Sequence, residues 1–459
     1  MLADMGFVHA LGVATNTDAH LLLPGLPSRS CEQMLNSVGH GGSGCISIGN
    51  NLEACYLGSV ADCMPQCTAL PTTARDAFQD PSAWTRSTSP SIRSAASAWR
   101  TVTSSPHFAD LAKDPSNKAV YQLLIAADDA ATDDGSGTVT HDMAPDIAAL
   151  ASVAGKHSQR AFTTVLTAQT FQRLMNDHSV PLETRCRVRQ CSAQGAGRFI
   201  GSIPAQHSPW NLTDEEYLVN WWHRFGLPQR LLLAPSACCA ARCTAFGPAA
   251  RFDRAEFATG VHALSCPHSG LRYARHQALL RYVCAWLAEA MGATIDTTNV
   301  ACHVQDNERV DALASLPYSI LTGGKTVAID ATCPCPLCPS HVHAGTADAA
   351  NSVTREAEID KATKHRADCE RLGYKYTTAA MTSFGGWGDD FLRAFVRPHF
   401  RAMRAHEKAA GGTGWETVAA QHQFFERASI VMARANAAMV AVAKGGPQRV
   451  ASAGRGEAA

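Results

Sequence analysis

Two carboxylates and two lysines stand at spacings that suit metal-dependent cleavage of a phosphodiester. Asp330 lies in the apolar, β-type run 327–332, Asp311 lies one predicted hairpin before it, and Lys361 and Lys364 lie on the next predicted helix. Carboxylate oxygens bind hard divalent cations, and a nearby ammonium positions water and offsets the charge that builds on a phosphate. The pattern therefore predicts a catalytic Mg²⁺ site at Asp311 and Asp330, with Lys361 or Lys364 beside it.

A second group of residues has the spacing of a structural zinc site. Cys239, Cys243, His262 and Cys266 form two pairs, and three residues separate the members of each pair. Thiolates and imidazole are the ligands that tetrahedral Zn²⁺ prefers, and four protein ligands leave no open position for catalysis. We expect a structural zinc knuckle here, in which Cys238 could replace Cys239. The alternative is a chance group of cysteine and histidine in a cysteine-rich chain.

A further Cys/His cluster directly follows Asp330. Its members are Cys333, Cys335, Cys338, His341 and His343, and prolines separate the three cysteines. Proline favours a rigid, extended loop. We therefore favour thiols without a metal over a third metal site.

Composition and charge limit the classes of protein to consider. The 459 residues, 46% hydrophobic and 17% charged, are enough for two or three domains with cores of their own. The formal net charge is zero, so any contact with nucleic acid must use local basic patches. The start of the chain lacks the basic segment of an export signal, so the 17 cysteines are expected to be thiols or metal ligands in an intracellular protein, nuclear if it is functional.

One such basic patch is predicted near the C-terminus. Arg393, Arg397, Arg401 and Arg404 recur at helical spacing. Such a stripe can contact several phosphates of a nucleic acid, although Pro398 should kink the helix. The alternative is a solvated helix face with no partner.

The predicted fold is α+β, with a helical N-terminal half, the Cys/His knuckle, and a small mixed sheet flanked by helices. Asp311 and Asp330 should lie on neighbouring strands of this sheet. Thr213 and Glu216 form a capping box that should open a helix. The expected segments are helical 1–85, linker-rich 86–150, helical 151–235, zinc-knuckle-like 236–276, a sheet domain with C-terminal helices 277–445 and a disordered tail 446–459.

A series of short motifs between about 160 and 443 resembles a known family. The motifs are Cys239 with Cys243, His262-Ala263-Leu264-Ser265-Cys266-Pro267, Arg275-His276, Arg309-Val310-Asp311, Val327–Thr332, Glu358–Lys364, Thr382–Gly388, Phe424–Arg427 and Arg434–Ala437. Together they are similar to the C-terminal region of non-LTR (LINE-like) retrotransposon reverse transcriptase polyproteins that carry a restriction-enzyme-like endonuclease.

The resemblance implies a domain that nicks target DNA, so that a polymerase can prime on the exposed end. It implies that Asp311 and Asp330 are the metal-binding acids of a PD-(D/E)xK-type core. Thr332 stands where simpler members of that superfamily carry the catalytic lysine, and Val310 replaces their usual proline. The resemblance therefore assigns the lysine to the following helix, as Lys361 or Lys364. The implied partner is DNA, and the RNA of the element is a second candidate.

A polymerase palm is not expected in this chain. Asp128-Asp129 and Asp389-Asp390 mimic polymerase acids, but the first pair has too little chain before it. The second pair should lie in the first turn of a helix, where negative charge is favourable. We therefore expect a truncated product without reverse transcriptase activity. Besides a nuclease, a zinc-dependent nucleic-acid-binding module without chemistry and an inert relic are open alternatives.

The two lysines should play different roles. On a helix over 352–372, Lys361 lies closer to the strand end that carries Asp330, and Lys364 lies further along. We predict that Lys361→Ala abolishes cleavage but keeps DNA binding, whereas Lys364→Ala mainly weakens binding and reduces its salt dependence. Nicking and salt-titrated binding assays measure both effects, and the reverse pattern would mean that the helix is rotated.

Overall fold

The structure is a computed structural model, and it describes residues 33, 38–40, 98, 101–102, 104–113, 158–202, 208–232, 257–266, 270–298, 309–317 and 326–443. Most of the predicted segments 1–85 and 86–150, and all of 446–459, lie outside the described residues. The chain divides into two compact units, one formed by Met1–His40 and Gly44–Asp177 and the other by Gly41–Ser43 and His178–Ala459. The break after Asp177 falls within the predicted helical segment 151–235.

The described part of the first unit is helical. It contains the 3₁₀ turns η1 (Val38–His40) and η2 (Ala109–Lys113) and the helix α10 (Ser158–Asn176). The ring of His40 packs against Phe171 of α10, with ring centroids 5.3 Å apart. None of the residues assigned to the candidate site lies in this unit.

The second unit combines helices with one sheet, which confirms the predicted α+β class. Its helical elements are α11 (Leu182–Cys191), η3 (Arg198–Gly201), α12 (Asp214–Phe225), η4 (Arg230–Leu232), α14 (Val261–Ser265), α15 (Leu271–Met291), η5 (Pro339–His341), α16 (Ala344–Asp348), α17 (Ser352–Arg371), α18 (Asp389–Phe391), the π-helical turn η6 (Leu392–Val396), α19 (Arg397–Ala409) and α20 (Trp415–Ala443). Among the described helices, none is long and apolar enough to cross a membrane.

The predicted capping box opens α12. The Glu216 amide donates to the Thr213 hydroxyl at 3.2 Å, and the Thr213 amide donates to the Glu216 carboxylate at 2.8 Å. The helix ends at Gly226, whose φ of 65° lies in the left-handed region that glycine adopts without strain. Both ends of α12 are therefore fixed by local sequence.

The sheet is small and mixed. Its strands lie in the order β1 (Thr294–Asp296), β2 (Ala312–Ser315), β3 (Val327–Thr332) and β4 (Lys375–Ala380). The first three strands are antiparallel neighbours, whereas β3 and β4 are parallel. Parallel neighbours need a crossover connection, and α17 lies in the connection between β3 and β4. The short strand β1 was not predicted from the sequence.

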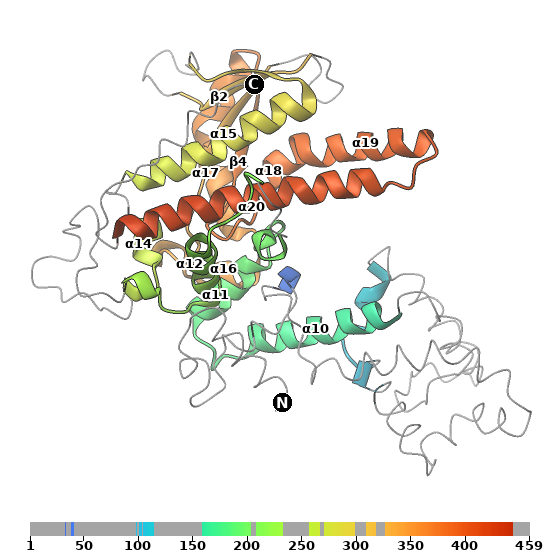
Figure 1. Cartoon of the computed structure of the whole chain (residues 1–459), viewed down its shortest axis with the longest axis vertical. Coiled ribbons are helices and arrows are strands. Elements are labelled where there is room, and N and C mark those ends of the chain that lie inside the picture. The colour runs from blue at the N-terminus through green and yellow to red at the C-terminus, as the bar shows by residue number, and fades with distance from the viewer. Residues whose placement is uncertain are drawn as a thin grey trace, which may run out of the picture. The chain divides into compact units, whose positions relative to one another are not determined.

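Helices cover both faces of the sheet. On one face Ile329 and Ala331 of β3 join a large core with Val283 of α15, Phe391 of α18 and Phe424 of α20. Figure 1 shows α19 and α20 side by side, joined at one end, with α15 crossing near α20. On the other face, Val310 and Ala328 pack with Cys369 of α17. Because side chains alternate along a strand, Asp330 shares the α17 face with Ala328.

A buried polar network ties the elements around the sheet together. Asn436 of α20 is fully buried, and its amide donates to Asn220 of α12 and to the Ser383 carbonyl at 3.0 and 2.7 Å. Arg275 of α15 donates to Asn436 at 3.2 Å and to the Cys333 carbonyl at 2.8 Å. This network holds α15 against the end of β3, so that the next residue, His276, has a fixed position.

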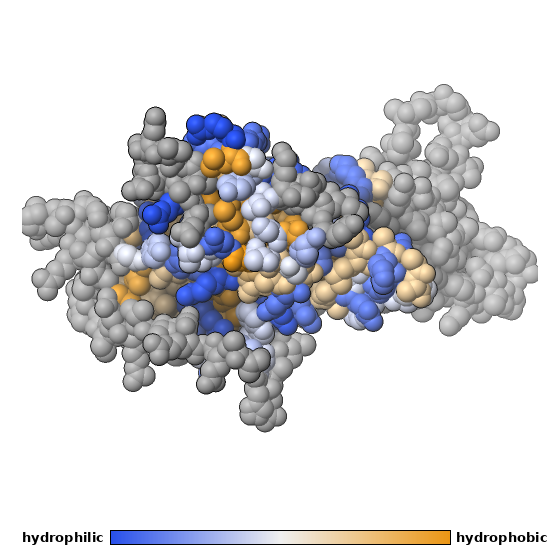
Figure 2. All heavy atoms as spheres, turned by 90° about the horizontal axis from the view of Figure 1, so that it is seen from above, coloured by the Kyte–Doolittle hydropathy of each residue, from blue (hydrophilic) through white to orange (hydrophobic). Residues whose placement is uncertain are grey.

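The surface is mixed in character. In the view of Figure 2, hydrophobic residues of the described part form a narrow strip bordered by hydrophilic ones. Among the described residues, the exposed large apolar side chains come from α15, α17, α20 and the segment between α17 and β4, and Tyr273 and Trp415 are the most exposed of them, at 68% and 72%.

Gly388 is a point where the fold has no room for a side chain. A Cβ atom there would collide with the carboxylate of Glu358 and lie 3.1 Å from Ala380 Cβ. Glu358 accepts a hydrogen bond from the Asp390 amide at 2.9 Å, so it cannot move without loss of that bond. We predict that Gly388→Ala lowers the free energy of unfolding by about 1–3 kcal/mol. Urea denaturation measures this, with Gly201→Ala as control.

Gly201 suits this purpose because nothing lies within 4 Å of the Cβ position there. Its substitution should change the unfolding free energy by no more than about 0.5 kcal/mol. Equal effects of the two substitutions would mean that Glu358 is not packed against Gly388.

Candidate functional site

The structure brings together the two acids that the sequence singles out. Asp330 lies on β3 with its side chain 1% exposed, and Asp311 directly precedes β2. The Asp311 amide donates to the Ile329 carbonyl at 3.0 Å, and the Ala331 amide donates to Asp311 Oδ2 at 2.7 Å. The main chain of β3 thus holds the Asp311 carboxylate beside Asp330, close enough that each carboxyl shifts the pKa of the other.

Helix α17 adds a lysine and a histidine to this pair. Lys361 Nζ lies 2.9 Å from Asp330 Oδ1, and His365 Nε2 lies 3.3 Å from Asp330 Oδ2. The Tyr376 hydroxyl of β4 donates to the same Oδ2 at 3.4 Å. Lys361 is one-third exposed whereas His365 is buried, at 34% and 3%. Asp330 is therefore surrounded by donors. Of the two donors on α17, Lys361 is more exposed to solvent than His365.

Asp311 has its own partner on α15. His276 Nε2 lies 3.1 Å from Asp311 Oδ1, and both side chains are about one-fifth exposed, at 19% and 21%. One oxygen of Asp311 is thus fixed by an imidazole and the other by the Ala331 amide. Together these contacts fix the orientation of the carboxylate.

The electrostatics of the pair are asymmetric. Burial, followed by the hydrogen bond to Asp311, raises the pKa of Asp330 to about 7, although Lys361 acts against this rise. Burial also acts to raise the pKa of Asp311, but the hydrogen bonds from His276 and Asp330 outweigh it and lower that pKa to about 2. The first proton that the pair binds as the pH falls therefore goes to Asp330.

The donor set fits Mg²⁺. Two like charges cannot be buried side by side unless a proton or a cation lies between them. Among the described residues, no group of three or more His, Cys, Asp and Glu side chains is placed to hold a metal ion. Mg²⁺ is usually held by one or two carboxylates and keeps several waters. Asp311 and Asp330 supply two such carboxylates.

A cavity lies beside Lys361 and His276, which are partners of the two acids. Its volume is about 600 Å³, and Lys361, His276, Tyr273 and Arg272 contribute to its lining. This volume lies within the range of about 300–1,000 Å³ that is usual for small-molecule sites. A substrate in this cavity would contact Lys361 directly.

Only half of the predicted zinc knuckle can be located. Cys239 and Cys243 lie outside the described residues. His262 lies in α14, Cys266 follows this helix, and the Cys266 amide donates to the His262 carbonyl at 2.8 Å. The two are therefore one helical turn apart, as their spacing predicts, and the zinc site itself stays a prediction.

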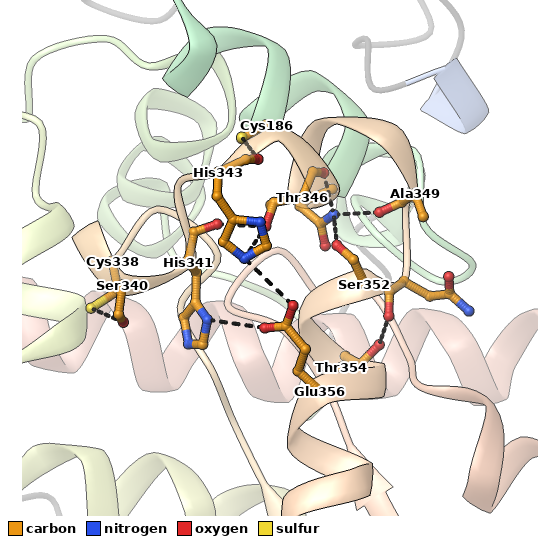
Figure 3. A network of polar contacts seen from close by, with 12 residues as sticks. Cys186, Cys338, Ser340, His341, His343, Thr346, Ala349, Ser352, Thr354 and Glu356 are labelled. Atoms are coloured by element: carbon orange, nitrogen blue, oxygen red, sulfur yellow. Dashed lines mark hydrogen bonds and ion pairs between the residues drawn. The ribbon is translucent and has the colours of Figure 1, made fainter.

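The Cys/His cluster from Cys333 to His343 contains buried thiols and imidazoles that face a carboxylate. Cys333 and Cys335 are buried, and burial raises the pKa of both thiols. Figure 3 shows His341 and His343 turned towards opposite oxygens of Glu356, at 3.6 and 3.4 Å. The two imidazoles thus face a carboxylate of α17.

The arginine stripe is only partly available for a partner. Arg397 is bonded to the Asp389 carboxylate at 2.7 Å, and Arg393 donates to the Asp389 carbonyl at 3.4 Å. Arg401 and Arg404 are exposed on α19. Pro398 lies in the first turn of α19, where its missing amide costs little. The π-helical turn η6 directly precedes this helix.

Three members of the site were missed from the sequence, namely His276, His365 and Tyr376. His365 lies one helical turn after Lys361, a spacing that puts both on one face of α17. That spacing could have identified it. Lys364 is exposed, so it lies away from the buried face that His365 occupies.

Comparison with known proteins gives no family. No protein-family model matches the chain, and no curated protein matches it. The function is therefore argued from the site itself.

The proton on Asp330 predicts how metal binding depends on pH. A cation must displace the proton of Asp330, whose pKa is about 7. Mg²⁺ affinity should therefore rise by up to about tenfold per pH unit from about pH 6 to pH 7 and then level off. Calorimetric titration of the metal-free protein measures this.

Glu358→Gln serves as the control for this titration. Burial also raises the pKa of Glu358 to about 7, but its carboxylate is bonded to the Asp390 amide. The pH dependence should persist in this variant. Equal Mg²⁺ affinity of the unmodified protein at about pH 6 and pH 8 would contradict the protonation of Asp330.

Proposed function

We propose that this protein is a retroelement-derived, Mg²⁺-dependent DNA endonuclease that nicks its target. The observation that carries this proposal is the meeting of Asp311, Asp330 and Lys361, with the lysine 2.9 Å from Asp330. Asp311 directly precedes β2, Asp330 lies in β3, and Lys361 lies on α17 in the crossover to β4. Two acids and an ammonium beside an open cavity are the groups that hydrolysis of a phosphodiester requires.

Each side chain has a role in this reaction. Asp311 and Asp330 would hold the ion, and bound Mg²⁺ would supply Lewis-acid chemistry at the phosphate. Lys361 lines the cavity, so its ammonium can orient water and offset negative charge that develops on the phosphate. His276 keeps Asp311 in one orientation. His365 and Tyr376 do the same for Asp330, and they are positioning residues.

The resemblance to retrotransposon endonucleases supports the same assignment. It places the metal-binding acids at Asp311 and Asp330 and the lysine on the helix after the second acid. Lys361 on α17 satisfies this pattern in space, although Thr332 occupies the usual lysine position in the sequence. A PD-(D/E)xK-like core with a migrated lysine is therefore part of the proposal.

A zinc-dependent nucleic-acid-binding remnant without chemistry is the second candidate. The exposed Arg401 and Arg404 and the helical-turn spacing of His262 and Cys266 favour it. In that case the protein would bind DNA in a salt-dependent way, would lose binding on Cys243→Ser, and would cleave nothing.

Plasmid nicking tests the proposal. Purified protein with Mg²⁺ should convert supercoiled plasmid to the open circle, and EDTA should stop this reaction. Asp330→Ala removes a metal ligand and should reduce the rate by at least about a hundredfold, the size of effect seen when a group that stabilises the transition state is removed.

Asp368→Ala is the matched control for this test. Asp368 lies at the far end of α17 and pairs with the exposed Arg371, so this variant should nick at the normal rate. Nicking that survives in Asp330→Ala would rule out the assigned site. DNA binding without any nicking by the unmodified protein would favour the binding remnant.

A further inference from the structure

Tyr273 is an aromatic residue that the fold leaves open to solvent beside the candidate site. It lies in the first turn of α15, and it is 68% exposed. Burial of an aromatic ring normally stabilises a protein, and this ring gains little from such burial. Its exposure therefore calls for an explanation other than packing.

The Tyr273 ring is held in a defined orientation. It stacks on His276 with an interplanar angle of 17° and ring centroids 5.9 Å apart. His276 is in turn bonded to Asp311 at 3.1 Å. The three residues form a row that begins at the acid pair and ends at the outer face of the Tyr273 ring. A further flat ring could extend this stack.

The surroundings of Tyr273 match one ligand class. Tyr273 lines the same cavity as Lys361 and the exposed Arg272. The two cations suit phosphates, whereas the open aromatic face suits a planar base. Stacking on aromatic side chains tolerates every base, because each base has a π-face.

We propose that Tyr273 is a stacking platform for an unpaired nucleobase of the DNA strand that flanks the scissile phosphate. The proposal rests on the proposed endonuclease function, since it takes the phosphate to lie at Asp311 and Asp330. The base on Tyr273 would fix the position of the strand in the cavity. Tyr273 would then set which phosphate reaches Lys361, as a positioning residue with no role in the chemistry.

The test compares two labelled probes of equal length. One is single-stranded oligodeoxythymidine and the other is an oligomer of abasic residues, which keeps the phosphates and lacks the bases. Binding is measured with Ca²⁺ in place of Mg²⁺ to prevent cleavage. The unmodified protein should bind the thymidine oligomer about tenfold more tightly than the abasic one, the typical contribution of one stacked base.

Tyr273→Ala should abolish this preference, and Tyr273→Phe should keep it, because the ring rather than the hydroxyl is required. Trp415→Ala is the control, since Trp415 is 72% exposed on α20 and does not line the cavity. It should keep the preference as well. Ca²⁺ affinity should be the same in all of these variants.

The outcomes separate this inference from the proposed function. A preference that is absent from the unmodified protein, or that survives in Tyr273→Ala, overturns the base platform even if the protein nicks plasmid. A preference that depends on Tyr273, in a protein that nicks no plasmid, keeps the platform and overturns the endonuclease.

Discussion

Two neighbouring acidic side chains, one buried and one partly buried, are the constraint on which the candidate site depends. Isolated carboxylates are costly to bury, and two of them together must be stabilised by donors, by a proton or by a cation. Asp330, 1% exposed, receives donors from α17 and β4, and Asp311 receives an imidazole from α15 and the Ala331 amide. A structural role alone would be met more simply by apolar residues. The cost is therefore a physical reason to assign these acids a function.

The scaffold around the acids explains how they are kept together. The antiparallel pairing of β2 with β3 sets Ala312 opposite Ile329, and the Asp311 carboxylate binds to the main chain of β3. The parallel pairing of β3 with β4 forces a crossover, and α17 in this connection lies over the Asp330 side of the sheet. On the opposite side, the buried contacts of Arg275 and Asn436 hold α15 in place.

The side chains that contact the two acids differ in their access to the cavity. His365 and Tyr376 approach Asp330 from within the fold, whereas Lys361 and His276 also border the cavity. A ligand in the cavity would therefore contact the Lys361 ammonium and the His276 imidazole, whereas His365 and Tyr376 do not line the cavity. The row from Asp311 through His276 to Tyr273 continues along the same open side. Binding and chemistry would thus occur on one side of the acid pair.

The sequence by itself determined the parts that depend on local patterns. The capping box at Thr213, the helix over 352–371 and the apolar strand before Thr332 follow from periodicity and turn chemistry, which act over a few residues. The hairpin also made Asp311 and Asp330 neighbours, because antiparallel strands in sequence order usually pair. The choice of Lys361 over Lys364 as the lysine beside Asp330 followed from their positions along the helix.

Only the tertiary structure decided the rest: His276, His365 and Tyr376 meet the acids through packing of α15, α17 and β4. Helical spacing puts His365 on the same face as Lys361. Which faces of distant elements are buried together is not encoded by such local spacing.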